Sequence, residues 1–306
     1  MQTSALARKP RSRLRNSDVL WGILFVLPAL LLAIPFKIFP LLRGLYESTL
    51  MWKGTTLVGF VGLANYQRML EDKTLQAAFL NAFKIMLTLP IWVLLPMVLA
   101  FLIFQRTPGW SFFRATYFLP YTISPLIVGM IFREILQNSG PLNTFLRSIG
   151  LGVAALPWLG KQTTALWALD GVVLWSLTGL GVITYLAGFA TISEEILEAA
   201  TLDGAGFWSK FFLVVLPLMR PVMGYWTILC TGGMFIWMFP FIHALTEGGP
   251  GFSTMLPEYL VYLTSFRFVE RGYGTAIGVV LFFFVLSFSF LQVRHMYMAG
   301  TGQGGE

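Results

Sequence analysis

Charged side chains are scarce in this sequence: Asp, Glu, Lys and Arg make up only 11% of its 306 residues. A soluble domain usually carries about a quarter charged residues, so this chain has too few to cover a surface that faces water on all sides. Hydrophobic residues make up 56% of the sequence, and 16% of the residues are aromatic. This composition predicts a protein that crosses a membrane several times.

Cysteine and histidine are also scarce. Cys230 is the single cysteine, which excludes a disulfide framework and a cysteine-based metal site. The two histidines, His243 and His295, stand near the ends of different apolar runs, and no cluster of carboxylates accompanies them. The segment 160–163 (GKQT) lacks the leading glycine of a phosphate-binding loop. We therefore expect no catalytic residue, no metal and no cofactor in this chain.

Basic residues are concentrated at the N-terminus. The formal net charge is +7, and five basic residues lie in the first fifteen positions: Arg8, Lys9, Arg11, Arg13 and Arg15. A basic protein can bind nucleic acid, but the positive-inside rule explains these residues more simply as the cytoplasmic flank of a first span. The apolar run continues to about Leu42, so we expect a retained span rather than a cleaved signal peptide.

Long apolar runs divide the rest of the chain. A hydrocarbon core about 30 Å thick needs roughly 20 apolar residues per helix. Six stretches meet this requirement: 19–42, 78–104, 112–136, 165–189, 212–245 and 273–293. The fifth is too long for one straight span, and we expect it to bend near Pro217 and Pro221. The predicted fold class is an all-α polytopic membrane protein with six transmembrane helices.

The topology follows from the cytoplasmic N-terminus, because six crossings return the C-terminus to the same side. The segments predicted to be cytoplasmic are 105–111, 190–210 and the tail from residue 294. The segments predicted to face outward are 47–77, 137–164 and 246–272, and within them 138–150 and 258–268 have the pattern of short amphipathic helices on the membrane surface. The predicted division is a basic segment 1–18, a membrane domain 19–297 and a flexible glycine-rich tail 298–306.

A short polar segment interrupts the apolar sequence at 198–221 (EAATLDGAGFWSKFFLVVLPLMRP). We expect Ser193 to cap a helix whose first turn holds two glutamates, where the helix dipole favours carboxylates. Gly204 stands where a left-handed residue would end this helix, which glycine does at no steric cost. A second helix then leads to Pro217. On the residues alone, this elbow fits either a knob that docks into a partner or an ordinary solvated loop.

The spacing within this elbow resembles a known signature. It consists of Glu198-Ala199-Ala200, three residues, Gly204, nine residues, Val214, one residue and Leu216-Pro217, with Asp203 beside the glycine. This order is similar to the cytoplasmic loop of permease subunits in binding-protein-dependent ABC importers. The family usually has Ile where Val214 stands, which is a mild departure.

The resemblance extends along nearly the whole chain. The segments 60–66 (FVGLANY), 113–120 (FRATYFLP) and 245–251 (LTEGGPG) look like the carbohydrate-uptake branch of these importers, that of the maltose, glycerol-3-phosphate and trehalose systems. Glu247 stands where the family often has Gly, and its role stays open. The resemblance implies the type I importer permease fold, in which the elbow is a coupling helix that docks in a cleft of the ATP-hydrolysing subunit.

The resemblance also implies a site and partners. The predicted ATPase-coupling residues are Glu198, Ala199, Ala200, Asp203, Gly204, Leu216 and Pro217. The implied partners are a second permease in a heterodimer, two copies of an ATPase subunit that uses ATP and Mg, and an extracytoplasmic solute-binding protein. The chain itself would be no enzyme. It would lie in a bacterial inner membrane, and its substrate would be a sugar, an oligosaccharide or a polyol derivative.

Sugar recognition combines aromatic faces with hydrogen-bonding groups, and the fourth and fifth stretches contain both. The predicted substrate-path residues are Trp175, Tyr185, Trp226, Thr231, Trp237 and Phe241. Packing or lipid contact is the alternative for each of them. Lys84 and Asp170 are ionisable groups inside predicted spans, and either function or snorkelling with local ion pairing explains them.

Two other functions stay open. One is an importer of the same class for a different solute. The other is a secondary transporter or membrane-embedded transferase, for which we would expect broken helices in matching halves with a buried acidic residue, or a cluster of catalytic carboxylates. The sequence shows neither pattern, and it does not identify the sugar.

Overall fold

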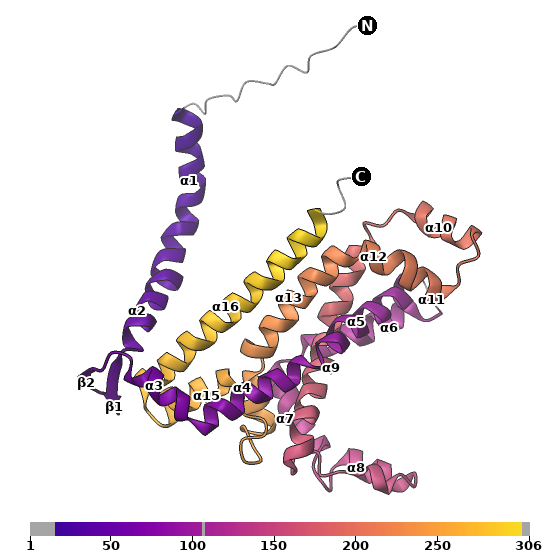
Figure 1. Ribbon diagram of the computed structural model, residues 1–306. Coiled ribbons are helices and arrows are strands. Elements are labelled where there is room, and N and C mark those ends of the chain that lie inside the picture. Colours follow the sequence, from indigo (N-terminus) through magenta and orange to yellow (C-terminus); the bar gives the residue numbers. More distant parts are fainter. Residues whose placement is uncertain (1–15, 106–107, 302–306) are drawn as a thin grey trace.

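The computed structural model describes residues 16–105 and 108–301. Most of the predicted basic segment 1–18 and the end of the predicted tail lie outside these ranges. Within them, four helices are long and apolar enough to cross a membrane, and two bent helix pairs raise the number of candidate spans to as many as six. The protein is a helical, multi-pass membrane protein (Figure 1).

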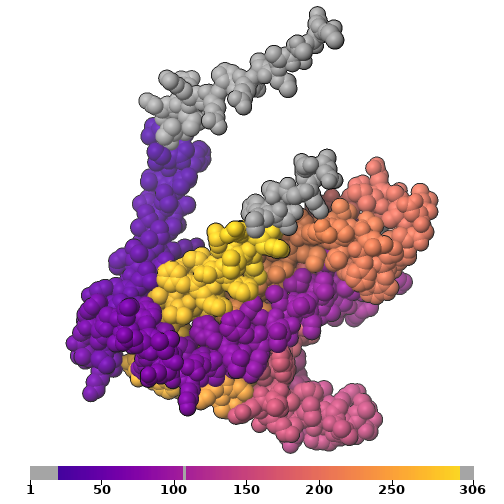
Figure 2. Space-filling model, viewed as in Figure 1, coloured from indigo at the N-terminus to yellow at the C-terminus, as the bar shows by residue number. Residues whose placement is uncertain are grey.

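The first candidate span stands apart from the others. It comprises α1 (Asn16–Ala33), the π-helix η1 (Ile34–Ile38) and α2 (Phe39–Glu47), and none of its most apolar stretch is buried. Figure 2 shows it as a column separated from the rest of the molecule by open space over most of its length. Its C-terminal end is fixed, because Arg271 at the start of the last helix donates two hydrogen bonds to Glu47, both at 3.0 Å.

A small hairpin follows the first candidate span. Strands β1 (Leu50–Lys53) and β2 (Thr56–Phe60) pair antiparallel, with Leu50 opposite Phe60, and α3 (Ala64–Glu71) follows. Asp72 then caps the next helix by accepting hydrogen bonds from the backbone N–H groups of Thr74 and Leu75. The cap fixes where the second span begins.

The second and third candidate spans differ in shape. The second comprises α4 (Lys73–Met86) and α5 (Leu89–Phe104). The third comprises α6 (Trp110–Thr122) and α7 (Pro125–Ile135), which meet at an angle of 100°. The sequence predicted no bend in this stretch. Pro125 explains it, because the residue before a proline is driven out of the helical conformation, and Ser124 is extended with ψ 131°.

A segment with one short helix connects α7 to the fourth candidate span. It holds α8 (Pro141–Ser148) and the 3-10 turn η2 (Gly152–Ala154), and α9 (Gln162–Phe189) follows. Helix α9 is packed against α5, α6, α7 and α13. Glycines permit two of these close approaches: a Cβ atom on Gly179 would overlap the carbonyl oxygen of Tyr117 on α6, and one on Gly181 would lie 2.7 Å from Pro96 on α5.

After α9 the chain forms the elbow and returns to the membrane. The elbow contains α10 (Glu194–Leu202), α11 (Phe207–Ser209), the π-helix η3 (Lys210–Val215) and α12 (Leu216–Leu218). The fifth span continues as α13 (Arg220–Ile236), at 77° to the segment before it. The bend falls at Met219, between Pro217 and Pro221, where the sequence predicted it.

Three helices and a π-helix follow α13 and pack into the helix bundle. Helix α14 (Phe239–Leu245) follows a break after α13, and α15 (Pro257–Tyr262) with the π-helix η4 (Leu263–Arg267) precedes α16 (Arg271–Thr301). The segment 258–268 was predicted to be a helix on the membrane surface. Instead, α15 is packed against α4, α14 and α16, and Tyr259 and Leu260 are buried.

Candidate functional site

The elbow has the backbone geometry that its sequence predicts. Ser193 is extended and precedes α10 at the N-cap position, although its side chain makes no capping hydrogen bond, and Glu194 and Glu195 occupy the first turn. Gly204 has φ +80°, in the left-handed region, and no atom lies within 4 Å of the position that its Cβ would occupy. The N–H of Gly204 donates to the carbonyl of Thr201 at 3.0 Å, which closes the helix end.

An aromatic cluster holds this elbow against the membrane helices. Phe207 of α11 lies 4.9 Å from Phe101 of α5, between ring centroids, and Phe211 of η3 lies 5.4 Å from the same ring. Phe101 also contacts Phe189, the last residue of α9, at 5.9 Å. Phe101, Phe189 and Phe211 are fully buried. The elbow is therefore packed directly on the cytoplasmic ends predicted for the second and fourth spans.

The predicted coupling residues fall into two groups. Glu198, Ala199, Asp203 and Gly204 are exposed and Ala200 is half-buried, so these residues form one accessible surface. Leu216 and Pro217 are also half-buried, but they lie in α12, at the bend that starts the fifth span.

Sequence reasoning missed one residue of the accessible surface. Leu202, at the end of α10, is 89% exposed although it is a large apolar side chain. Its position immediately before Asp203 and Gly204 was the available signal. Leu202 adds an apolar side chain to the exposed surface that the predicted coupling residues form.

The predicted substrate-path residues also divide by exposure. Trp175 on α9 is 43% exposed, and Trp237 at the end of α13 is 47% exposed. The ring of Trp175 lies edge-on to Phe132 of α7 at 5.0 Å, and that of Trp237 lies over Gly233. These two rings are accessible to a solute in the isolated subunit.

The other four candidates are buried within this subunit: Tyr185, Trp226, Thr231 and Phe241. Trp226 donates its Nε1–H to the carbonyl of Trp92 at 3.0 Å, and its ring lies edge-on to Tyr185 at 6.4 Å. Thr231 accepts a hydrogen bond from Gln292 of α16 at 2.9 Å. Their contacts fix α13 against α5, α9 and α16.

A small apolar void lies between α9 and α13, and Trp226 and Trp237 line it together with Leu177, Leu180 and Gly233. Its volume is about 10 Å³, which is at the lower limit for a single water molecule and far too small for a sugar ring. The void is therefore a gap in the packing of these helices and not a solute site.

The ionisable groups inside the spans have local explanations. Asp170 of α9 is 4% exposed and accepts a hydrogen bond from the indole N–H of Trp92 at 3.1 Å. Lys84 is exposed on α4 and donates to Asn81 at 3.4 Å. Asn81 in turn donates to the carbonyl oxygens of Phe252 and Met255, so this cluster fixes the turn after α14 to α4.

Glu247 has an unusual backbone conformation. Its φ is +52°, in the left-handed region that glycine adopts most easily, and its carboxylate pairs with Arg133 of α7 at 3.5 Å. Both side chains are about half exposed, so the ion pair contributes little stability. The family resemblance, in which Gly is common at this position, agrees with this backbone.

The histidines lie apart and do not form a metal site. His243 shares a hydrogen bond with the hydroxyl of Tyr259 at 3.3 Å and stacks on Phe239. His295 is exposed near the end of α16. Within residues 16–105 and 108–301, no group of three or more His, Cys, Asp or Glu residues is arranged to bind a metal ion.

The sequence is similar to several curated transport proteins, although no protein-family model matches it. It is 32% identical over 278 residues to the multiple sugar-binding transport system permease protein MsmF of Streptococcus mutans, covering 90% of this chain and 94% of that protein. It is 30% identical over 295 residues to the lactose transport system permease protein LacF of Rhizobium radiobacter, covering 94% and 97%. The trehalose/maltose transport system permease protein MalF of Thermococcus litoralis is 28% identical over 287 residues, covering 92% and 96%.

The fold is similar to that of a solved transporter. A chain of a bacterial ABC transporter involved in the import of the acidic polysaccharide alginate superimposes with a TM-score of 0.78, covering 92% of this chain and 95% of that chain, at 19% identity. At this identity the superposition shows the fold, and the closer sequence relatives show the family. This chain belongs to the family of permease proteins of ABC importers for sugars.

Proposed function

We propose that this permease forms half of the translocation pathway for a sugar, an oligosaccharide or a polyol derivative that an extracytoplasmic binding protein delivers. Its relatives are named for multiple sugars, lactose and trehalose or maltose. A related solved transporter was captured with its periplasmic protein bound to an alginate pentasaccharide. ATP and Mg would be used by partner ATPase subunits, and this chain would be no enzyme.

The observation that best supports coupling to ATP hydrolysis is the geometry of the elbow. Gly204 ends α10 in a conformation that glycine favours, and the exposed residues around it, including Leu202, form a compact apolar and acidic surface. The aromatic contacts of Phe101 connect this surface to two membrane helices. Docking in a cleft of an ATPase subunit would pass ATP-driven movement to the bundle.

A matched pair of variants tests this coupling. Gly204→Asp adds a charged side chain to the docking surface, and Gly62→Asp adds the same side chain at φ +58°, with only the ring of Phe60 near its Cβ position, at 3.8 Å, on the predicted outer side. Both substitutions place Asp in the left-handed region. We expect Gly204→Asp to retain insertion but to lose uptake while the ATPase subunit still hydrolyses ATP, and Gly62→Asp to transport normally. Normal uptake by Gly204→Asp would refute the docking role.

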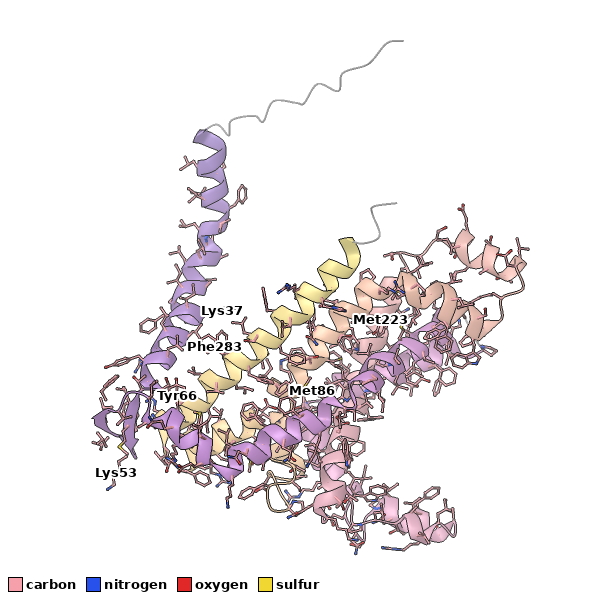
Figure 3. All side chains as sticks on the ribbon, viewed as in Figure 1. Lys37, Lys53, Tyr66, Met86, Met223 and Phe283 are labelled. Atoms are coloured by element: carbon pink, nitrogen blue, oxygen red, sulfur yellow. The ribbon has the colours of Figure 1, made fainter. Side chains whose placement is uncertain are left out.

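A second permease would complete the pathway as a heterodimer. The exposed first span and α16 border an open space, with Lys37 on one side and Phe283 on the other (Figure 3). At its outer end lies a cavity of about 780 Å³, lined by Gly44, Val269 and Gly278 among others. Small residues allow close approach of membrane helices. A helix of the second permease would cover these apolar surfaces.

Native mass spectrometry of the complex, extracted gently from its host membrane, tests this assembly. One copy of this chain with one other permease and two ATPase subunits is the expected composition. A stable complex that contains two copies of this chain and no second permease would contradict the heterodimer.

The substrate path would run past the exposed tryptophans. Trp175→Ala and Trp237→Ala remove rings that a sugar could stack on, so we expect a raised apparent KM for uptake. Tyr185, Trp226, Thr231 and Phe241 would act by fixing the helices that carry these rings. The matched control is Trp167→Ala, an equally exposed tryptophan nearer the start of α9, with 46% exposure. An unchanged KM in both test variants would remove this region from the path.

The orientation is part of the same proposal. Six crossings would place both termini and the elbow in the cytoplasm of a bacterial inner membrane, with 1–18 as a basic anchor, 19–297 as the permease domain and 298–306 as a tail. Cysteines introduced at Leu202 and Lys53, both exposed, should react with a membrane-impermeant thiol reagent from opposite sides. Reaction of both from the same side would overturn this topology.

A further inference from the structure

A small outer lobe is held rigidly between α7 and α9. It comprises α8, η2 and the turn to Trp158, and Asn143 is its fully buried centre. The side-chain amide of Asn143 donates to the carbonyl of Leu156 at 2.8 Å and accepts from the indole N–H of Trp158 at 2.9 Å. It also lies within hydrogen-bonding distance of the carbonyls of Gln137 and Asn138. The lobe therefore has a fixed shape.

This rigid lobe carries an apolar tip. Four large side chains within nine residues are exposed: Phe145, Ile149, Leu151 and Val153, the last of them by 97%. Phe145 and Ile149 lie one turn apart on the same face of α8, and Gly150, with φ +81°, turns the chain so that Leu151 and Val153 follow. A cluster of this kind needs an apolar medium or a partner to cover it.

The position of the lobe favours lipid as that medium. Figure 1 shows α8 projecting sideways from the bundle below α7, on the side away from α1 and the open space beside it. The adjoining helix α7 exposes an apolar face of its own, formed by Leu126, Ile127, Met130 and Ile131. The lobe thus continues an apolar surface of a bent pair that is long and apolar enough to span the membrane.

The charges of the lobe fit the same environment. Arg147 is exposed on α8, and Lys161 is exposed at the start of α9. Basic side chains beside an apolar face are typical of helices that lie in the membrane interface, where they meet lipid phosphates. Trp158 also lies in the lobe, and tryptophan is enriched at this depth.

We propose that this lobe is an interfacial anchor, whose tip of Phe145, Ile149, Leu151 and Val153 inserts into the outer leaflet and binds a phospholipid surface. The anchor holds the junction of α7 and α9 at a fixed depth. Because Asn143 makes the lobe rigid, insertion of the tip restrains the outer ends of both helices. The inference uses only the placement of the lobe, so it stands apart from the identity of the transported solute.

Site-directed fluorescence tests the anchor in the assembled transporter. Cys230, the single native cysteine, is replaced by Ala, and a cysteine at Val153 is labelled with an environment-sensitive dye. The near-complete exposure of Val153 means that this substitution removes few contacts within the protein. Ser148→Cys, also on the surface of the lobe but outside the apolar tip, is the matched control, and Ile149→Cys is a second test position. The complex is placed in nanodiscs of phosphatidylethanolamine and phosphatidylglycerol.

Three outcomes are distinguishable. The anchor predicts a shift of emission to shorter wavelength at positions 153 and 149, and loss of intensity with doxyl-labelled phospholipid but not with aqueous iodide. Position 148 should show weaker quenching by doxyl lipid. Quenching of the tip by iodide would overturn the proposal and leave the tip in water, free for a binding protein. Protection from both quenchers would also overturn it and place a protein partner over the lobe.

Discussion

Gly179 makes the closest approach between α9 and α6, and replacing it should loosen the central span. A Cβ atom at this position would overlap the carbonyl oxygen of Tyr117 and lie 3.0 Å from the Cα of Phe118. Both obstacles are backbone atoms, so no side-chain rotation relieves them. Overpacking of this kind destabilises proteins by about 1–3 kcal/mol, and we expect Gly179→Ala to lie toward the upper end of that range.

Gly171 provides the matched control for this substitution. It lies in the same helix, and no atom lies within 4 Å of its Cβ position. Gly171→Ala therefore gains helix propensity of up to about 1 kcal/mol without a clash. In thermal unfolding of the purified complex, Gly179→Ala should lower Tm by roughly 5 °C, and Gly171→Ala should leave it unchanged or slightly higher. Equal shifts for the two variants would refute the close contact with α6.

Substitutions at three further positions, outside and inside the spans, give additional tests. Burial raises the pKa of the Glu258 carboxyl from 4.5 to about 8, although hydrogen bonds from the backbone N–H groups of Met238 and Phe239, at the start of α14, partly oppose this. Between pH 4.5 and about 8, the folded state therefore binds more protons at this carboxyl than the unfolded state does. The free energy of unfolding should fall as the pH rises through this window, and Glu258→Gln should flatten the dependence of Tm on pH. Val269 is a β-branched residue at φ +56°, so Val269→Gly should relieve about 1–2 kcal/mol of backbone strain. The conformational entropy that glycine loses on folding offsets part of this gain, so we expect Tm to rise only slightly. A lower Tm would contradict the strain. Asp170→Leu leaves the N–H of Trp92 unpaired and should destabilise the complex by about 1–3 kcal/mol, whereas Asp170→Asn keeps an acceptor; equal Tm values would remove the hydrogen bond as the reason for this buried residue.

The elbow was predictable because its signals are local. The two glutamates after Ser193 and the glycine at 204 each act through the backbone of α10 itself, and the structure gives that glycine φ +80°. The bend of the fifth span was predictable for the same reason, since Pro217 and Pro221 bracket Met219. A proline also explains the 100° bend between α6 and α7, but Pro125 lies inside an apolar run that length alone assigns to one span.

The burial of individual residues could not be predicted in the same way. Helix α9 is apolar around most of its circumference, so its sequence does not distinguish the side that meets α5 from the side that carries Trp175. Trp226 and Trp237 look alike in sequence, yet one donates a hydrogen bond to a backbone carbonyl in the core and the other is half exposed. The partners of Trp226, which are Trp92 and Tyr185, come from helices distant in the chain, which no local pattern encodes.

The two amphipathic segments that were predicted to face outward also show that sequence alone does not predict which side chains are buried. Both 138–150 and 258–268 have an amphipathic pattern, but α8 exposes its apolar side chains and α15 buries Tyr259 and Leu260. The difference comes from the neighbours, because α4, α14 and α16 surround α15, whereas α8 projects beyond the bundle (Figure 1). Helices broken in matching halves, together with a buried acidic residue, were expected of a secondary transporter. The structure has two bent pairs, and the hydrogen bond from Trp92 gives buried Asp170 a structural explanation.

The transmission of movement from the elbow depends on residues outside its signature. Gly204 and its neighbours provide an accessible surface, but a surface moves a bundle only if it is rigidly attached to it. The attachment is Phe101, whose ring contacts Phe207 and Phe211 of the elbow and Phe189 at the end of α9. Because close-packed interiors transmit strain, we expect a push on α10 to reach α5 and α9 through these rings. The proposed coupling motif is therefore recognisable in sequence, and the aromatic contacts that would transmit its movement are recognisable only in the fold.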